Sequence, residues 1–282
     1  MTETRRSIDA ETAPGAVDGM SRRSILRGSA FVAGGVLLGG AAQVGMAGSA
    51  LAAPEPSISS RSAWGARAPQ NPAQVTSTRP TYIVVHHTAT ANSTDYSQSH
   101  AFALSRSIQN YHMDSNGWAD TGQQLTISRG GHIMEGRNLS LSSIRGGRHV
   151  VGAHVANYNG VAVGIENEGT YTSVGPTTAL YNSLVATCAW LCTVYSRPTS
   201  AIVGHRDLNA TACPGNQLYA RLPQLRSDVG ARLTSIGLAE LHDADLRTDE
   251  RPPYPRTPDD EPFVRYDHGP ALGSRDPNHA IG

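Results

Sequence analysis

Hydrophobic positions follow two different periods between residues 53 and 241. Short runs of β-branched and aromatic residues, bounded by polar stretches, are typical of strands. They predict strands at 81–87, 123–128, 132–135, 161–167 and 201–204. Apolar residues at helical spacing predict helices at 97–112, 177–195 and 221–233. Strands interleaved with helices indicate an α/β fold, and the length of this segment fits one mixed domain.

The N-terminal residues have the composition of a targeting segment. Residues 21–26 read Ser-Arg-Arg-Ser-Ile-Leu, and residues 28–54 carry no charge. Residues 50–52 read Ala-Leu-Ala, which places small residues at the spacing a signal peptidase accepts. Residues 1–52 therefore resemble a twin-arginine export signal. We expect a secreted or cell-wall-associated protein with no stable membrane insertion after signal removal. The alternative is a retained anchor, although interrupting glycines make this segment weakly apolar for a membrane span.

The C-terminal residues 242–282 contain seven Pro, nine acidic residues and five Arg, without helical or strand periodicity. This composition predicts a disordered tail after a domain at 53–241. The zero formal net charge is the sum of +1 in the signal, +3 in the domain and −4 in the tail. A protein held by nucleic-acid phosphates would show a basic excess, so no nucleic-acid partner is expected. The sequence leaves the oligomeric state open.

Two patches between the strands could bind a metal. His86 lies near the end of strand 81–87, on the face opposite His87, and His205 and Cys213 lie eight residues apart in a later loop. Two imidazoles and a thiolate with one open position would make a catalytic zinc site, whereas a structural site would close with four ligands. The alternative is a hydrogen-bonded strand histidine and a small buried cysteine.

Several motifs together resemble those of peptidoglycan recognition proteins and their relatives, the zinc-dependent N-acetylmuramoyl-L-alanine amidases. They occur in family order, at 61–66, 82–88, 108–122, 134–137, 151–154 and 204–215. The resemblance implies a single mixed central β-sheet flanked by helices. It also implies hydrolysis of the lactyl–L-alanine amide of peptidoglycan or muropeptides, with Zn²⁺ held by His86, His205 and Cys213. Thr211, two residues before the last ligand, would help to polarise the substrate carbonyl.

One position departs from the family pattern. Many of the amidases have a Tyr near the metal-activated water where this chain has Gln123. Glutamine cannot act as a base. Residues 163–169 instead resemble the strand of cytosolic anhydro-muropeptide amidases in which the first Glu acts on that water, which implies Glu166 as the catalytic base. Glu166 shares its strand face with small residues, which leaves room for a substrate. The alternative is a buried or surface-paired glutamate.

Further residues complete the predicted site and its rival interpretation. His154, Trp118, Tyr158 and Asn159 are expected to line the substrate groove, although Trp118 fits the core equally well. The remaining cysteines, 188 and 192, lie one helical turn apart and fit a core better than a disulfide. The rival function is a peptidoglycan-binding module without activity. Non-cleaving family members generally lack the third metal ligand, which this chain keeps, so an enzyme is favoured. The sequence leaves the form of the substrate and its stem peptide open.

Overall fold

The computed structural model describes residues 52–253. The strands are β1 (Ile58–Ser59), β2 (Val75–Thr76), β3 (Tyr82–His87), β4 (Leu125–Ile127), β5 (Ile133–Glu135), β6 (His149–Val150), β7 (Ala162–Asn167) and β8 (Ile202–Gly204). All five strands predicted from the sequence are therefore confirmed, as β3, β4, β5, β7 and β8. Their β-branched residues are buried on both faces, which is usual where a parallel sheet is covered on both sides.

Six of the strands form one mixed sheet in the order β1-β5-β4-β7-β3-β8. β3 lies between β7 and β8 and runs parallel to both, while β4 and β5 form the predicted antiparallel hairpin. Parallel strands place their carboxyl ends at the same edge of a sheet. Residues that end β3, β7 and β8 are therefore neighbours. β2 and β6 form a separate antiparallel pair.

The three predicted helices are confirmed as α2 (Gln98–Asn110), α4 (Thr178–Tyr195) and α6 (Leu222–Ser235). The shorter helices are α1 (Arg61–Trp64), α3 (Ser140–Arg145), α5 (Asn216–Tyr219) and α7 (Glu240–Asp243). The single turns are the π-helical η1 (Tyr111–Ser115), which continues α2, and the 3₁₀ turns η2 (Thr199–Ala201), η3 (His205–Asp207) and η4 (Thr248–Glu250). Helix α4 begins where the Thr177 side chain accepts from the backbone N–H of Leu180.

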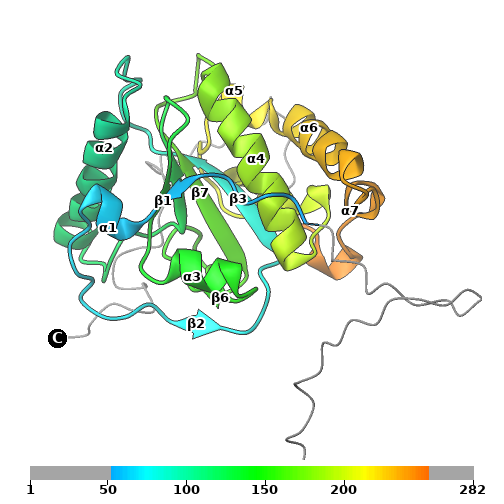
Figure 1. Cartoon of the computed structure of the whole chain (residues 1–282), viewed down its shortest axis with the longest axis horizontal. Helices are drawn as coiled ribbons and strands as arrows, with labels where there is room; N and C mark the ends of the chain where they lie inside the picture. The colour runs from blue at the N-terminus through cyan, green and yellow to red at the C-terminus, as the bar shows by residue number, and fades with distance from the viewer. Residues whose placement is uncertain (1–51, 254–282) are drawn as a thin grey trace, which may run out of the picture. The chain divides into compact units, whose positions relative to one another are not determined.

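Helices α4 and α6 cover one face of the sheet (Figure 1). Ile83 and Val85 of β3 face this main core, whereas Tyr82 and Val84 face a smaller cluster on the other side. This division confirms the alternation predicted for the strand. The cysteines at 188 and 192 of α4 are buried free thiols in the main core, which confirms their structural role. Within residues 52–253, no helix is both long and apolar enough to span a membrane.

The ordered domain extends past its predicted end at residue 241. Helix α7 crosses that boundary, and Leu246 is buried against the cluster of Tyr82 and Val84. The side chains of Arg197 and Glu250 form an ion pair at 2.9 Å. No periodic signal marks this extension in the sequence, because Leu246 is one apolar residue in a charged stretch. The predicted signal at 1–51 and the tail at 254–282 lie outside the described residues.

Candidate metal and catalytic site

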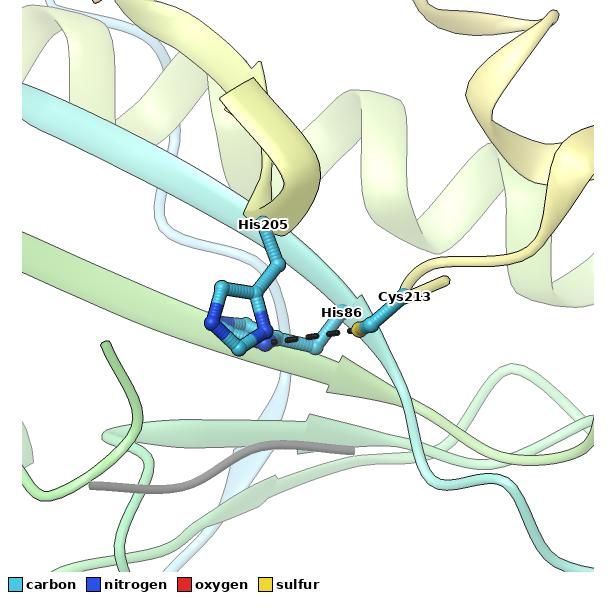
Figure 2. Close-up of side chains that lie close together, drawn as sticks. All are labelled: His86, His205 and Cys213. Atoms are coloured by element: carbon cyan, nitrogen blue, oxygen red, sulfur yellow. Dashed lines mark hydrogen bonds between the residues drawn. The ribbon is translucent and has the colours of Figure 1, made fainter. Parts of the chain in front are cut away.

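The three predicted metal ligands lie together at the carboxyl edge of the sheet. His86 is near the end of β3, His205 directly follows β8, and Cys213 lies in the loop before α5. One ligand atom from each residue lies within 4.8 Å of the others. Sγ of Cys213 is 3.6 Å from Nδ1 of His86, and the two imidazole rings are 4.6 Å apart between centroids (Figure 2). All three side chains are buried.

Arg206 holds the loop that carries Cys213. Its side chain is fully buried, donates to Oδ1 of Asn216 at 2.9 Å and to the carbonyl of Ala212 at 2.5 Å, and lies over the ring of Tyr219. The Arg206 backbone N–H also donates to the carbonyl of Cys213 at 3.1 Å. Because these bonds link both ends of the loop, the position of the thiol is set by protein contacts.

Two further contacts hold Cys213, one at its side chain and one at its backbone. The backbone N–H of His87 points to Sγ at 3.4 Å, and the backbone N–H of Cys213 donates to Oγ1 of Thr211 at 3.2 Å. Burial raises the pKa of this thiol well above its ordinary value. A buried thiol of this kind loses its proton when a metal cation binds it. Two imidazoles and one such sulfur are a donor set that fits Zn²⁺.

Hydrogen bonds define which nitrogen of each imidazole carries the proton. Nε2 of His154 is 3.1 Å from the carbonyl oxygen of Ala162, which only accepts, so this nitrogen is the donor. Burial lowers the pKa of His154 to about 3, so its ring is neutral and Nδ1 accepts. Nε2 of His86 lies 3.0 Å from that atom and donates to it. His205 donates from Nε2 to Oδ1 of Asn209 at 3.1 Å.

Glu166 lies on β7 directly beside His86. The two residues are partners in the parallel register of β7 and β3, so their side chains leave the sheet on the same face. On its other side, Glu166 is paired with Thr126 of β4. The glutamate is 3% exposed, and its charge contributes to the raised pKa of the Cys213 thiol. The structure therefore brings the predicted base to the predicted ligands.

Gln123 lies close to this strand pair as well. Its side chain is buried, and its amide nitrogen donates to Oγ1 of Thr126 at 2.8 Å. Thr126 is the residue that pairs with Glu166 across β4 and β7. Gln123, at the position where the sequence departs from the pattern that it resembles, thus bonds to the strand that flanks Glu166.

Two of the four side chains predicted to bind substrate are buried. His154 is 2% exposed and lies behind His86, and Trp118 is 1% exposed and stacks on His112 at 4.6 Å between ring centroids. Trp118 packs with Ala153 in a small core cluster, which agrees with the core alternative for this residue. The groove role of both residues stays a prediction, because the proposed catalytic residues Thr211 and Glu166 are buried to the same degree.

The other two shape a loop instead. Oδ1 of Asn159 accepts from the backbone N–H groups of His154 and Val155, at 2.8 and 3.0 Å. Tyr158 packs edge-on against Tyr82, at the opposite end of β3 from the ligand His86. Four residues of strand separate those ends by roughly 13 Å. Asn159 thus shapes the loop of His154, and the groove role of Asn159 and Tyr158 stays a prediction.

The pocket beside the site was not predicted. A cavity of about 330 Å³ begins at Thr88, next to the ligand strand. Its other lining residues are Ala89, Thr90, Leu104, Ser107, Ile108 and Tyr111. Leu104, Ile108 and Tyr111 stand at helical spacing in the sequence, a pattern that does not distinguish a core face from the wall of a pocket. Tyr111 is 49% exposed, so part of this stripe faces the pocket. An apolar stripe that ends in an exposed tyrosine was the available signal.

Comparisons with known proteins agree with this geometry. The profile of the N-acetylmuramoyl-L-alanine amidase family matches residues 76–216, half of the chain. The chain is 33% identical over 168 residues to peptidoglycan-recognition protein SC2 of Drosophila simulans, covering 57% of this chain and 82% of that protein. It is 33% identical over 169 residues to a Homo sapiens N-acetylmuramoyl-L-alanine amidase, covering 58% of this chain but only 27% of the human protein.

A solved structure gives the same fold. Peptidoglycan recognition protein-LE, in complex with tracheal cytotoxin (monomeric diaminopimelic acid-type peptidoglycan), is 28% identical with a TM-score of 0.50. The match covers 59% of this chain and 92% of that chain. The predicted arrangement of a central mixed sheet with flanking helices is thus confirmed.

Proposed function

Because the chain belongs to the N-acetylmuramoyl-L-alanine amidase family, we propose that it is an exported zinc-dependent enzyme that hydrolyses the lactyl–L-alanine amide bond of peptidoglycan or muropeptides. One observation carries this proposal: two imidazoles and a thiol lie within 4.8 Å of one another, with the carboxylate residue Glu166 in register beside His86. A metal donor set next to a buried carboxylate is the arrangement that amide hydrolysis needs.

His86, His205 and Cys213 would hold the zinc. Three protein ligands leave a fourth position, as in catalytic rather than structural sites. A bound Zn²⁺ would supply a Lewis acid that polarises the amide carbonyl and increases the acidity of water. The pairing of a deprotonated thiol with two neutral imidazoles would leave the site with a net positive charge that favours a developing oxyanion.

Glu166 would move the protons in this reaction. Its carboxylate would take a proton from the attacking water and return it to the leaving L-alanine nitrogen, so that one residue serves as base and then as acid. Thr211 would assist by orienting the substrate carbonyl from the ligand loop. Gln123, bonded to Thr126, would keep the neighbouring strand in place without exchanging a proton.

The cavity that begins at Thr88 would receive the peptide side of the substrate. It lies next to the ligand strand and combines hydroxyl groups with the exposed ring of Tyr111. Ligand pockets commonly combine apolar and aromatic side chains with a few polar groups that orient the ligand. The complex of the related recognition protein with a monomeric peptidoglycan supports a ligand of this class.

The proposal extends to the location of the protein. The Arg-Arg doublet and the uncharged stretch that follows it support export through a twin-arginine route, and thus a secreted or cell-wall-associated enzyme. Fractionation of cells expressing the chain, with Arg22 and Arg23 both changed to Lys as the comparison, tests this. Loss of the exported form in the double variant is the expected result, and unchanged export would reject the signal.

The reaction is tested by incubating the zinc-loaded protein with purified peptidoglycan and analysing the released material by mass spectrometry. Stem peptides with free L-alanine amino termini are expected. The full-length Glu166→Gln variant serves as control, because it keeps the shape of the side chain but cannot take up a proton. Sedimentation of the wild-type protein with peptidoglycan, without any release of stem peptides, would instead identify a binding module.

A further inference from the structure

We infer that His154 and Asn209 are positioning residues that fix Nδ1 as the metal-binding nitrogen of both histidine ligands. The inference rests on the proposed zinc site and concerns the hydrogen-bond partners of its two histidine ligands. An imidazole binds a metal through one nitrogen, and the hydrogen bond at the other nitrogen decides which one is available. In this protein each ligand imidazole has a protein acceptor at Nε2.

His86 is fixed through a chain of three groups. The carbonyl oxygen of Ala162 accepts from Nε2 of His154 at 3.1 Å, which leaves Nδ1 of His154 as an acceptor. Nε2 of His86 lies 3.0 Å from that Nδ1 and donates to it. The proton of His86 is therefore on Nε2. Its Nδ1 carries the lone pair and faces Sγ of Cys213 at 3.6 Å (Figure 2).

His205 is fixed in the same way by an amide. The side-chain nitrogen of Asn209 donates to the carbonyl oxygens of Ala156 and Leu208, at 3.2 and 3.0 Å. These two bonds orient the amide so that Oδ1 faces His205 and accepts from its Nε2 at 3.1 Å. Both ligands thus carry the proton on the same ring nitrogen, although their partners come from different loops.

The backbone around His154 leaves space for an imidazole. A Cβ atom at Gly164 would lie 2.6 Å from Nδ1 of His154, and one at Gly152 would lie 2.5 Å from its Cδ2. Both positions are therefore restricted to glycine by the ring. An apolar side chain of similar size could fill the same space. It would leave the His86 Nε2–H and the Ala162 carbonyl without their bonds, so the polar atoms of His154 carry the function.

Matched variants separate positioning from packing. His154→Leu removes both hydrogen bonds, whereas His154→Gln keeps an acceptor and a donor in one side chain. His149→Leu is the control, because His149 is also fully buried and donates from Nε2 to the carbonyl of Asn159 at 2.8 Å. This change perturbs the loop of His154 through Asn159 but removes neither the His86–His154 nor the His205–Asn209 hydrogen bond. Asn209→Leu tests the second residue independently.

The first measurement is the zinc affinity of the full chain, by competition with a chromophoric chelator. His154→Leu and Asn209→Leu should each lose about 10–100-fold, the usual effect of removing a partner behind a metal ligand. His154→Gln should recover most of this loss, and His149→Leu should bind like the wild type. Wild-type affinity in folded His154→Leu, or an equal loss in His149→Leu, would overturn the inference.

The second measurement needs no metal. Long-range ¹H–¹⁵N spectra of the metal-free wild-type protein report which ring nitrogens are protonated, and His86, His154 and His205 should all carry the proton on Nε2. Protonation of His86 or His205 at Nδ1 would overturn the inference. Failure of the wild type to bind zinc, with the expected tautomers observed, would reject the proposed function alone. The spectra also decide the matter if a variant does not fold.

Discussion

Gly164→Ala is a small change whose effect on the metal site follows from distances in the structure. Gly164 lies on β7, and a Cβ atom there would be 2.6 to 2.8 Å from three ring atoms of His154. Ordinary contacts of a Cβ atom begin at 3.4 Å, so the ring must retreat by 0.6 to 0.8 Å. The retreat lengthens or bends the 3.0 Å hydrogen bond between His154 and His86.

Two effects on stability oppose each other in this variant. Overpacking a buried site costs about 1–3 kcal/mol. Replacing glycine restricts the unfolded chain and returns about 0.4–1 kcal/mol where the backbone conformation suits alanine. We therefore expect the free energy of unfolding to fall, by at most about 2.6 kcal/mol. Zinc affinity should fall by about tenfold, because the partner of His86 is displaced rather than removed.

The assay is urea unfolding of the metal-free protein, followed by chelator competition for zinc affinity. Gly160→Ala is the matched control, because a Cβ atom at that position meets nothing within 4 Å. It should be neutral or slightly stabilising, with wild-type zinc affinity. Equal unfolding free energies and equal zinc affinities in the two alanine variants would refute the close fit of His154 against β7.

Three further predictions concern single side chains. Glu166→Gln should keep zinc affinity within a few-fold but lower kcat by about 10²–10⁴-fold, measured as release of stem peptides, and near-normal turnover would mean another base. Cys213→Ala should lose both zinc and activity, and full metal occupancy by elemental analysis would show that the third ligand is wrong. Leu246→Ala should lower the free energy of unfolding by about 2–5 kcal/mol, because the side chain is buried beside Tyr82. Val174→Ala, at a 46% exposed position, is the control. If the two variants lowered the free energy of unfolding equally, the segment after residue 241 would not be part of the folded domain.

The sequence predicted the strands and loops that bring the metal ligands together. It did not predict the side chains that hydrogen-bond to the histidine ligands. Alternation in the strand of His86 and in the strand of Glu166 assigned each side chain to a face, and the parallel order of the sheet then made those faces coincide. Periodicity does not say what lies against a face. The sequence therefore did not indicate that Gly164 on β7 makes room for the ring of His154 beside His86.

The same limit explains why the sequence did not predict the pocket or the C-terminal end of the folded domain. Leu104 and Ile108 would be apolar whether they packed in a core or lined a pocket. Only the tertiary structure shows that they border a cavity. Leu246 is a single apolar residue among charges, and its burial depends on a cluster whose other members lie between Tyr82 and Leu208 in the sequence. Long-range contacts of this kind leave no local pattern to detect.

The hydrogen bonds of Arg206 to the loop of Cys213 indicate how far folding of the protein depends on zinc. The loop is closed by bonds between protein groups, and His86 belongs to a strand with a neighbour on each side. Removal of zinc by a chelator should therefore leave the protein folded. A zinc finger differs, because it folds only when it binds its metal. Zinc would add to stability only by mass action, by RT ln(1 + [Zn²⁺]/Kd), and the melting temperature would rise with the logarithm of the free zinc concentration.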